Sequence, residues 1–205
     1  MFRKKSEGPA EKKSGWKEAL DVVIWALVMA FLARSFVVQA FRIPSGSMED
    51  TLLVGDFLFV NKFLYGAKIP FTDVRLPGLR EPEPGDIIVW RPEDEKQDYI
   101  KRCVAIEGDV VQIRDGILYR NGQRIDEPYV KFSQESYAPR NWGPFLVPDG
   151  EVLFLGDNRD NSRDGRFFGF KDWRETVQGK AIFIYWSWDS LKKFPRLERI
   201  GDLIH

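Results

Sequence analysis

The sequence predicts an all-β domain of antiparallel sheets that follows a single N-terminal helix. Two dipeptides that favour tight hairpin turns, Asp115-Gly116 and Asn121-Gly122, separate short apolar runs. A longer uncharged run near the N-terminus has the character of a helix. The strongest β signal comes from runs that are rich in β-branched and aromatic residues and too short for stable helices: 57–61, 86–90, 100–106, 151–155 and 180–186.

The segments between these runs complete the expected fold. The runs around the two hairpin dipeptides, 110–113, 117–119 and 123–125, predict a small antiparallel meander. Residues 81–85 and 133–148 are expected to be connections, and the second is long enough to suggest mobility or a crossing between subdomains. A chain of 205 residues with 43% hydrophobic content can bury one substantial core, so we expect about one globular domain.

Composition excludes several classes of protein. Lys plus Arg equals Asp plus Glu, at 31 each, which argues against a nucleic-acid binder with its usual basic excess. A single cysteine, Cys103, excludes an intramolecular disulfide and a zinc site built from several thiolates. We therefore expect no metal, no cofactor and no nucleic-acid partner.

The N-terminal region predicts a membrane anchor. Residues 1–20 form a basic tail, and residues 22–33 carry no charge, but 12 residues are too short to span a bilayer, which needs about 20. Extending the segment to 21–41 reaches that length, although it then includes Arg34 and Gln39. A cleavable signal peptide and an interfacial amphipathic helix are the alternatives. The basic flank predicts a cytoplasmic tail, so residues 42–205 would lie on the outer side of the membrane.

Ser47 and Lys101 are the candidate pair for chemistry. The only histidine, His205, is the last residue, and a chain end is a poor place to fix a general base. Ser47 lies in a Pro-Ser-Gly-Ser-Met segment just after the anchor, and Lys101 lies in an apolar strand. Each has a plainer interpretation. The serine segment is also typical of a linker, and alternation allows Lys101 to face solvent while Arg102 shares the opposite face.

A third candidate is the dense polar segment 156–166. From Asp160 through Ser162 and Asp164 to Gly165 it is similar to a calcium-binding loop, but the twelfth position is Lys171 where such loops carry a bidentate glutamate. The pattern therefore favours a hydrogen-bonded scaffold around a site over a calcium site.

In order and spacing, these segments resemble the type I signal peptidases, membrane-anchored serine proteases. The resemblance covers the N-terminal anchor and the segments 44–48, 51–56, 55–63, 101–109 and 156–166. It implies a Ser/Lys dyad in which Ser47 is the nucleophile and Lys101 the general base. It also implies that Ser162 orients the lysine amine, and that the Ser45 hydroxyl and the Ser47 backbone N–H form the oxyanion hole. The remaining implied residues support the site structurally: Gly156, Asn161, Asp164 and Arg166.

The resemblance also implies a setting and a substrate. It implies a coiled, partly barrel-like catalytic core and one transmembrane helix in the bacterial inner (plasma) membrane, close to the protein-export translocon. The partners would be membrane lipid and the signal peptides of exported preproteins, cut after small residues of the Ala-X-Ala type through an acyl-enzyme. Two other classes stay open here: a self-cleaving Ser/Lys repressor-type protease, and a noncatalytic membrane-tethered β interaction module. The distance between the Ser47 and Lys101 side chains separates the noncatalytic class from both enzymes.

Overall fold

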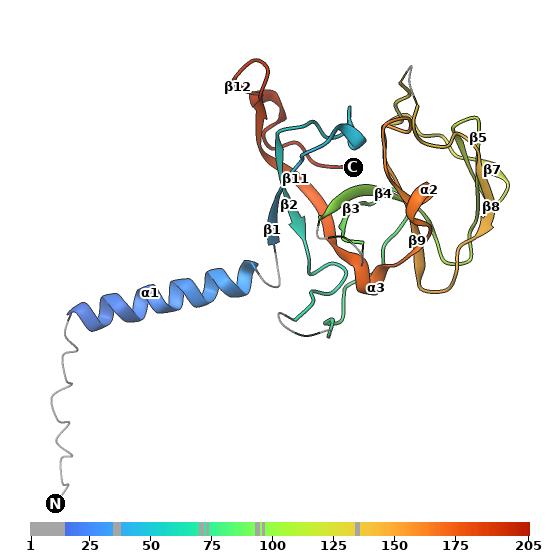
Figure 1. Cartoon of the computed structure of the whole chain (residues 1–205). Helices are drawn as coiled ribbons and strands as arrows, with labels where there is room; N and C mark the ends of the chain where they lie inside the picture. The colour runs from blue at the N-terminus through green and yellow to red at the C-terminus, as the bar shows by residue number, and fades with distance from the viewer. Residues whose placement is uncertain are drawn as a thin grey trace, which may run out of the picture.

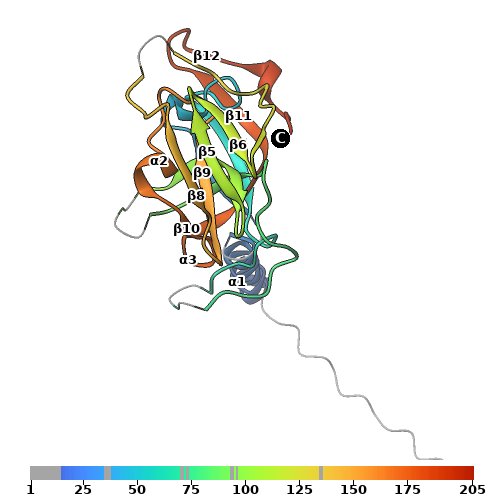
Figure 2. The same ribbon diagram turned by 90° about the vertical axis from the view of Figure 1, so that its right-hand side faces the viewer.

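The computed structural model describes residues 15–34, 38–69, 72, 74–92, 95, 97–133 and 136–205, which form one N-terminal helix and a β body (Figure 1). Helix α1, Gly15–Leu32, projects from the end of the β body opposite to β12 (Figures 1 and 2), and all its residues are exposed. Within the described ranges, no helix combines the length and apolar character needed to cross a membrane. Most of the predicted basic tail, residues 1–14, lies outside the described residues.

The helix does not have the bounds of the anchor predicted over 21–41. The helix begins at Gly15 and ends at Leu32, and Val38–Arg42 forms strand β1. β1 pairs antiparallel with β2, Val38 opposite Asn61, and the Phe41 side chain packs against the main core. These apolar residues therefore belong to the sheet, which explains why they continue the hydrophobic run without extending the helix. Residues 35–37, between helix and strand, lie outside the described residues.

The β body consists of two antiparallel sheets, which confirms the all-β prediction. The larger has the order β1-β2-β11-β3-β4-β9-β10 with β12 paired to β11, and the smaller has the order β7-β6-β5-β8. Register shifts in the pairings of β11 with β2 and β3, and of β4 with β9, increase the local twist, so the larger sheet is coiled and not flat. Besides β1, the strands are β2 Asp56–Asn61, β3 Ile87–Trp90, β4 Tyr99–Ile106, β5 Val110–Arg114, β6 Ile117–Arg120, β7 Gln123–Arg124, β8 Trp142–Leu146, β9 Glu151–Leu155, β10 Lys171–Asp172, β11 Val177–Asp189 and β12 Phe194–Pro195.

The predicted strands and hairpins are confirmed. The five β-rich runs correspond to β2, β3, β4, β9 and β11, and the meander corresponds to β5, β6 and β7. Asp115-Gly116 and Asn121-Gly122 all have positive φ, from 51° to 84°, as a two-residue hairpin turn of this type requires.

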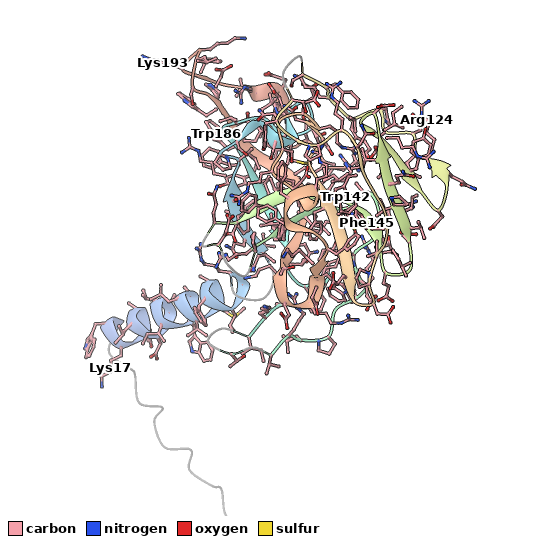
Figure 3. The ribbon with its side chains drawn as sticks, turned by 45° about the vertical axis from the view of Figure 1, so that its right-hand side comes forward. Lys17, Arg124, Trp142, Phe145, Trp186 and Lys193 are labelled. Atoms are coloured by element: carbon pink, nitrogen blue, oxygen red, sulfur yellow. The ribbon has the colours of Figure 1, made fainter. Side chains whose placement is uncertain are left out.

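The interpretation of 133–148 as a connection is wrong in part. β8, Trp142–Leu146, lies within it and pairs with β5 at one edge of the smaller sheet. The Trp142 and Phe145 rings pack together there, with centroids 4.7 Å apart (Figure 3). Pro144 is tolerated because it lies on an edge strand. Residues 134 and 135 lie outside the described residues.

The main core fixes the segment that follows Ser47. The Met48 and Leu52 side chains are fully buried in a cluster with Ile43, Leu58 and Val60. Because close-packed side chains have little freedom, this burial holds the turn that carries Ser47 against the sheet. The short helices are α2 Gly165–Phe168, α3 Trp173–Thr176, and the 3₁₀ turns η2 Gly46–Met48 and η3 Leu197–Arg199.

Candidate active site

Ser47 lies in the 3₁₀ turn η2, between β1 and β2. The Glu49 N–H donates to the Gly46 carbonyl and closes the turn, and the buried Met48 side chain attaches the turn to the core. The Ser47 carbonyl accepts a 3.1 Å hydrogen bond from the Asn158 N–H, which ties the turn to the polar loop 156–166. Ser47 is 7% exposed, so its hydroxyl sits at the floor of a cleft and not on a linker.

Lys101 is buried beside Ser47. Its Nζ lies 2.7 Å from Ser47 Oγ, although the two residues are 54 positions apart, and it donates a 2.8 Å hydrogen bond to the Ile100 carbonyl. The interpretation in which Lys101 faces solvent is wrong, since the residue is 2% exposed. β4 is an interior strand between β3 and β9, and both of its faces are covered, so the neighbouring Arg102 is buried as well.

The burial of Lys101 changes its acid–base chemistry. Desolvation disfavours the ammonium form and lowers the pKa of Lys101 from 10.5 to about 8, against the opposing effect of the Asp164 and Asp157 carboxylates. The Tyr99 ring lies 5.6 Å from Nζ. At neutral pH a useful fraction of this amine is therefore unprotonated and able to accept a proton.

The pair opens into a cleft of about 420 Å³. Its lining comes from β1 and the residues that follow it, from the start of β4 and from the polar loop. The lining includes the aliphatic residues Ile43, Val89 and Ile100. The lining consists of residues 41–47, Val89, 97–101, Tyr137, Asn161 and Arg163.

The polar loop packs against Ser47. A Cβ on Gly156 would lie 2.5 Å from the Ser47 carbonyl oxygen and 2.2 Å from Ser162 Oγ, so only glycine fits there. Asp164 accepts from the Gly156 N–H and from the Arg166 guanidinium, over 3.0 Å and 2.8–2.9 Å. Asn161 reaches the cleft. The structure thus brings Gly156, Asn161, Asp164 and Arg166 to the surroundings of Ser47.

Two further predicted residues are near the pair but make fewer contacts than the resemblance implies. Ser45 Oγ lies 3.5 Å from Ser47 Oγ. Ser162 is completely buried, and its hydroxyl has no hydrogen-bond partner in the described part of the chain. The hydrogen bonds of the Lys101 amine go to Ser47 and Ile100 and not to Ser162.

The carboxylates of the calcium-like loop are held by arginines. Asp160 pairs with Arg140, and Asp164 with Arg166. Among the described residues, no three His, Cys, Asp or Glu side chains are grouped closely enough to hold a metal ion.

Sequence reasoning missed two buried ion pairs next to the site. Arg102 Nε and Nη2 donate to the two carboxylate oxygens of Asp157 over 2.9 and 2.7 Å, and Thr51 Oγ1 donates to the same carboxylate over 2.6 Å. Arg159 pairs in the same way with Glu127 in the chain segment that follows β7. The alternating charges of 156–166 are the one signal that could have indicated such pairs, but it does not identify partners that lie far away in sequence.

His205 is not part of this cleft. The chain end is packed, because the Ile204 side chain is buried and the His205 carbonyl accepts from Arg102, but the His205 side chain is exposed. The His205 imidazole does not line the cleft that holds Ser47.

A mostly β body with a buried serine hydroxyl against a buried lysine amine, at the floor of a cleft, defines the class as a hydrolase built around a serine. The model of the family "Signal peptidase, peptidase S26" matches residues 16–186. The chain therefore belongs to the signal peptidase family and is a serine peptidase, as its resemblance to that family implied.

Individual relatives agree with this family. The chain is 36% identical to "Signal peptidase I" of Pseudomonas fluorescens, with 85% of this chain and 75% of the relative covered. It is also 36% identical to "Probable signal peptidase I-2" of Synechocystis, with 89% and 78% covered. A solved signal peptidase I from Enterococcus faecalis is 31% identical, with 49% of this chain and 97% of that chain covered, at a TM-score of 0.42. Membership of this family decides against the noncatalytic interaction module and the self-cleaving repressor-type protease.

Proposed function

We propose that the protein removes signal peptides from exported preproteins with Ser47 as nucleophile and Lys101 as general base. The observation that carries this proposal is the 2.7 Å distance between Ser47 Oγ and Lys101 Nζ inside a cleft. The distance lies within the range that direct proton transfer requires. The lowered pKa of Lys101 supports the same roles, because only the neutral amine can accept the serine proton.

The proposed reaction proceeds in two halves. Ser47 Oγ attacks the scissile carbonyl carbon while its proton moves to Lys101 Nζ, and a tetrahedral oxyanion forms. The C–N bond then breaks, Lys101 returns the proton to the leaving amine, and the signal peptide is left as an ester on Ser47. A water molecule next gives its proton to the neutral Lys101 and attacks the ester. The lysine proton passes to Ser47 Oγ, and the signal peptide leaves with a new carboxylate.

The groups around the pair have supporting roles in this proposal. The Ser45 hydroxyl and the Ser47 backbone N–H donate to the oxyanion, and both belong to the rigid turn at η2. Ser162 orients the amine by donating or accepting at Nζ once substrate has tightened the site. Its hydroxyl is buried and has no hydrogen-bond partner among the described residues, which supports this role, because a buried polar group without a partner is costly. Gly156, Asn161, Asp164 and Arg166 hold the loop in place.

The substrate would bind in extended form along the cleft. β1 is an edge strand of the larger sheet, so its free side can accept a further strand. Ile43, Val89 and Ile100 line the same cleft as Ser47, which is compatible with small apolar side chains such as alanine at the first and third positions before the cut.

Membrane attachment is proposed for α1. Its side chains are exposed on every side, and many of them are large and apolar, so contact with lipid would cover them. The basic residues before Val22 would hold the N-terminus in the cytoplasm. This orientation requires the chain before β1 to cross the membrane, and the catalytic domain would then face the outer side of the bacterial inner membrane, where preproteins emerge from the translocon.

The topology is tested by protease accessibility. In spheroplasts, protease added from outside should degrade the domain after residue 42, while an N-terminal epitope tag stays protected until the membrane is dissolved. A fully protected catalytic domain, with a secreted control protein digested in the same sample, would contradict the orientation.

The pH profile tests the role of Lys101. As the pH rises, kcat/KM should increase and level off above about pH 8, because Lys101 loses its proton with a pKa of about 8. At pH 7 about a tenth of the enzyme would carry the neutral base. His205→Ala removes the imidazole but keeps the backbone carbonyl that accepts from Arg102, so it should leave this rise of kcat/KM with pH in place, since the imidazole does not line the cleft. Ser162→Ala should lower the rate about tenfold. Loss of the pH-dependent rise in His205→Ala would remove Lys101 as the base.

A further inference from the structure

Two buried carboxylates lie close enough to Lys101 to favour its charged form. Asp164 and Asp157 are both fully buried, and both act on the lysine in this direction. Asp157 is held near the nucleophile, because its backbone N–H contacts the Met48 sulfur and the next residue donates to the Ser47 carbonyl. A general base must be neutral, so these charges oppose the function of the site unless other groups compensate them.

Each carboxylate is paired with an arginine in a two-bond geometry. Asp164 is held by Arg166 and also by two backbone N–H groups, so it organises the loop as well. The donors to the Asp157 carboxylate are side chains: Arg102 bonds both of its oxygens, and Thr51 donates to one of them. Arg102 is the residue after Lys101 in β4, and its position is fixed by the carbonyls of Gly85 and His205 and by the Tyr129 ring 3.7 Å away.

The pairing with Arg102 weakens the electrostatic effect of the Asp157 carboxylate on Lys101. A lone carboxylate acts as a full negative charge, and in a buried site its effect is weakly screened. A carboxylate bound at both oxygens by a guanidinium acts as a dipole, whose field falls off faster with distance. The position of Arg102 is rigid, so this compensation is built into the folded site.

We propose that Arg102, by holding the Asp157 carboxylate in a two-bond ion pair, keeps that carboxylate from stabilising the ammonium form of Lys101 and so sets the pH at which the base becomes active. Arg102 is thus a positioning residue, which acts on the chemistry through Asp157 and Lys101 without touching substrate. The inference rests on the proposed role of Lys101 as general base.

Other charged and polar groups also surround Lys101. On its own strand, Tyr99 presents its ring to the amine. The polar loop contributes Asp157 and Asp164 with Arg166, while the nearby hydroxyls of Ser47 and Ser162 are neutral. Arg42, Asp98 and Arg163 also line the cleft but are more accessible to solvent, which screens their charges.

The test is a charge cycle at residues 102 and 157. Asp157→Asn replaces the carboxylate with an amide of the same shape. Arg102→Gln leaves the Asp157 carboxylate without its cationic partner, and the double variant removes both charges. Asp160→Asn is the matched control, because Asp160 is a buried, arginine-paired carboxylate of the same loop that is not among the charges acting on Lys101. The first measurement is the acid limb of kcat/KM. The second is the NMR titration of the Lys101 side chain in ¹³C-lysine-labelled protein carrying Ser47→Ala, with the signal assigned by Lys101→Met.

We expect the two single variants to shift the midpoint pH of both measurements in opposite directions. Arg102→Gln should raise this midpoint by about one pH unit, and Asp157→Asn should lower it by about as much. The double variant should have a midpoint close to that of the wild type. Asp160→Asn should leave the midpoint unchanged. If Arg102→Gln does not fold, as judged by tryptophan fluorescence, the downward shift in Asp157→Asn decides the matter.

The two measurements separate the possible failures. Unchanged midpoints in both, or shifts of the same sign in the two single variants, would overturn the tuning role of Arg102. A lysine titration that moves while the kinetic limb does not would leave the tuning intact and overturn Lys101 as the general base, which is the proposed function.

Discussion

Ser47→Ala and Lys101→Met will each reduce signal-peptide cleavage by about 10⁴-fold or more, and the double variant will be no worse than either single variant. The reason is that nucleophile and base carry out one step together, across the 2.7 Å between their side chains. Removing either leaves no path for the proton. The measurement is kcat/KM on a preprotein in detergent or lipid, with circular dichroism to show that each variant retains its β fold.

Matched controls are available in the exposed hairpin between β11 and β12. Ser190→Ala and Lys192→Met make the same chemical changes at exposed positions and should leave cleavage within about twofold of the wild type. Normal cleavage by folded Ser47→Ala or Lys101→Met enzyme would remove the dyad from consideration. Losses that multiply in the double variant would show that the two residues act in separate steps.

The strands were predictable because their signals are local. β-branched and aromatic runs and two hairpin dipeptides are readable without knowledge of neighbours, and β2 to β7, β9 and β11 follow them. β1 and β8 were missed for reasons that are also local. Val38, Ala40 and Phe41 continue an apolar run that began in α1, and Gly143-Pro144 interrupts the pattern of β8. In both cases the tertiary partner, β2 or β5, decides the structure.

The site was less predictable from the sequence than the strands. Ser47 and Lys101 were identified by elimination of histidine and by resemblance, but alternation alone favoured a solvent-facing lysine. The burial of Lys101 depends on β9 and the polar loop, which are about 50 residues further along the chain, and no local pattern carries that information. The pairing of Arg102 with Asp157 has the same origin, because two charged residues 55 positions apart give no sign of their contact before the fold brings them together.

Burial of the base has a consequence for stability that can be measured. Lys101→Met, although inactive, should be more stable than the wild type by about 3 kcal/mol at pH 7, since lowering the pKa from 10.5 to about 8 represents free energy that the folded state loses by burying the ammonium. Methionine has a similar length and no charge, so it fills the same space without this cost. The measurement is the unfolding free energy from urea titration in detergent, followed by tryptophan fluorescence.

The pH dependence of this difference identifies its cause. The folded pKa of Lys101 lies below its unfolded value, so between about pH 8 and 10.5 the unfolded chain binds more protons, and the wild type gains stability as the pH rises through that window. The difference in unfolding free energy between Lys101→Met and the wild type should therefore have its full value below about pH 8 and fall below about 1 kcal/mol at pH 10. Lys192→Met, at an exposed lysine, should differ from the wild type by less than about 0.5 kcal/mol at both pH values. A Lys101→Met protein less stable than the wild type at pH 7 would mean that the ammonium is well paired in its site, and a well-paired ammonium could not serve as the base.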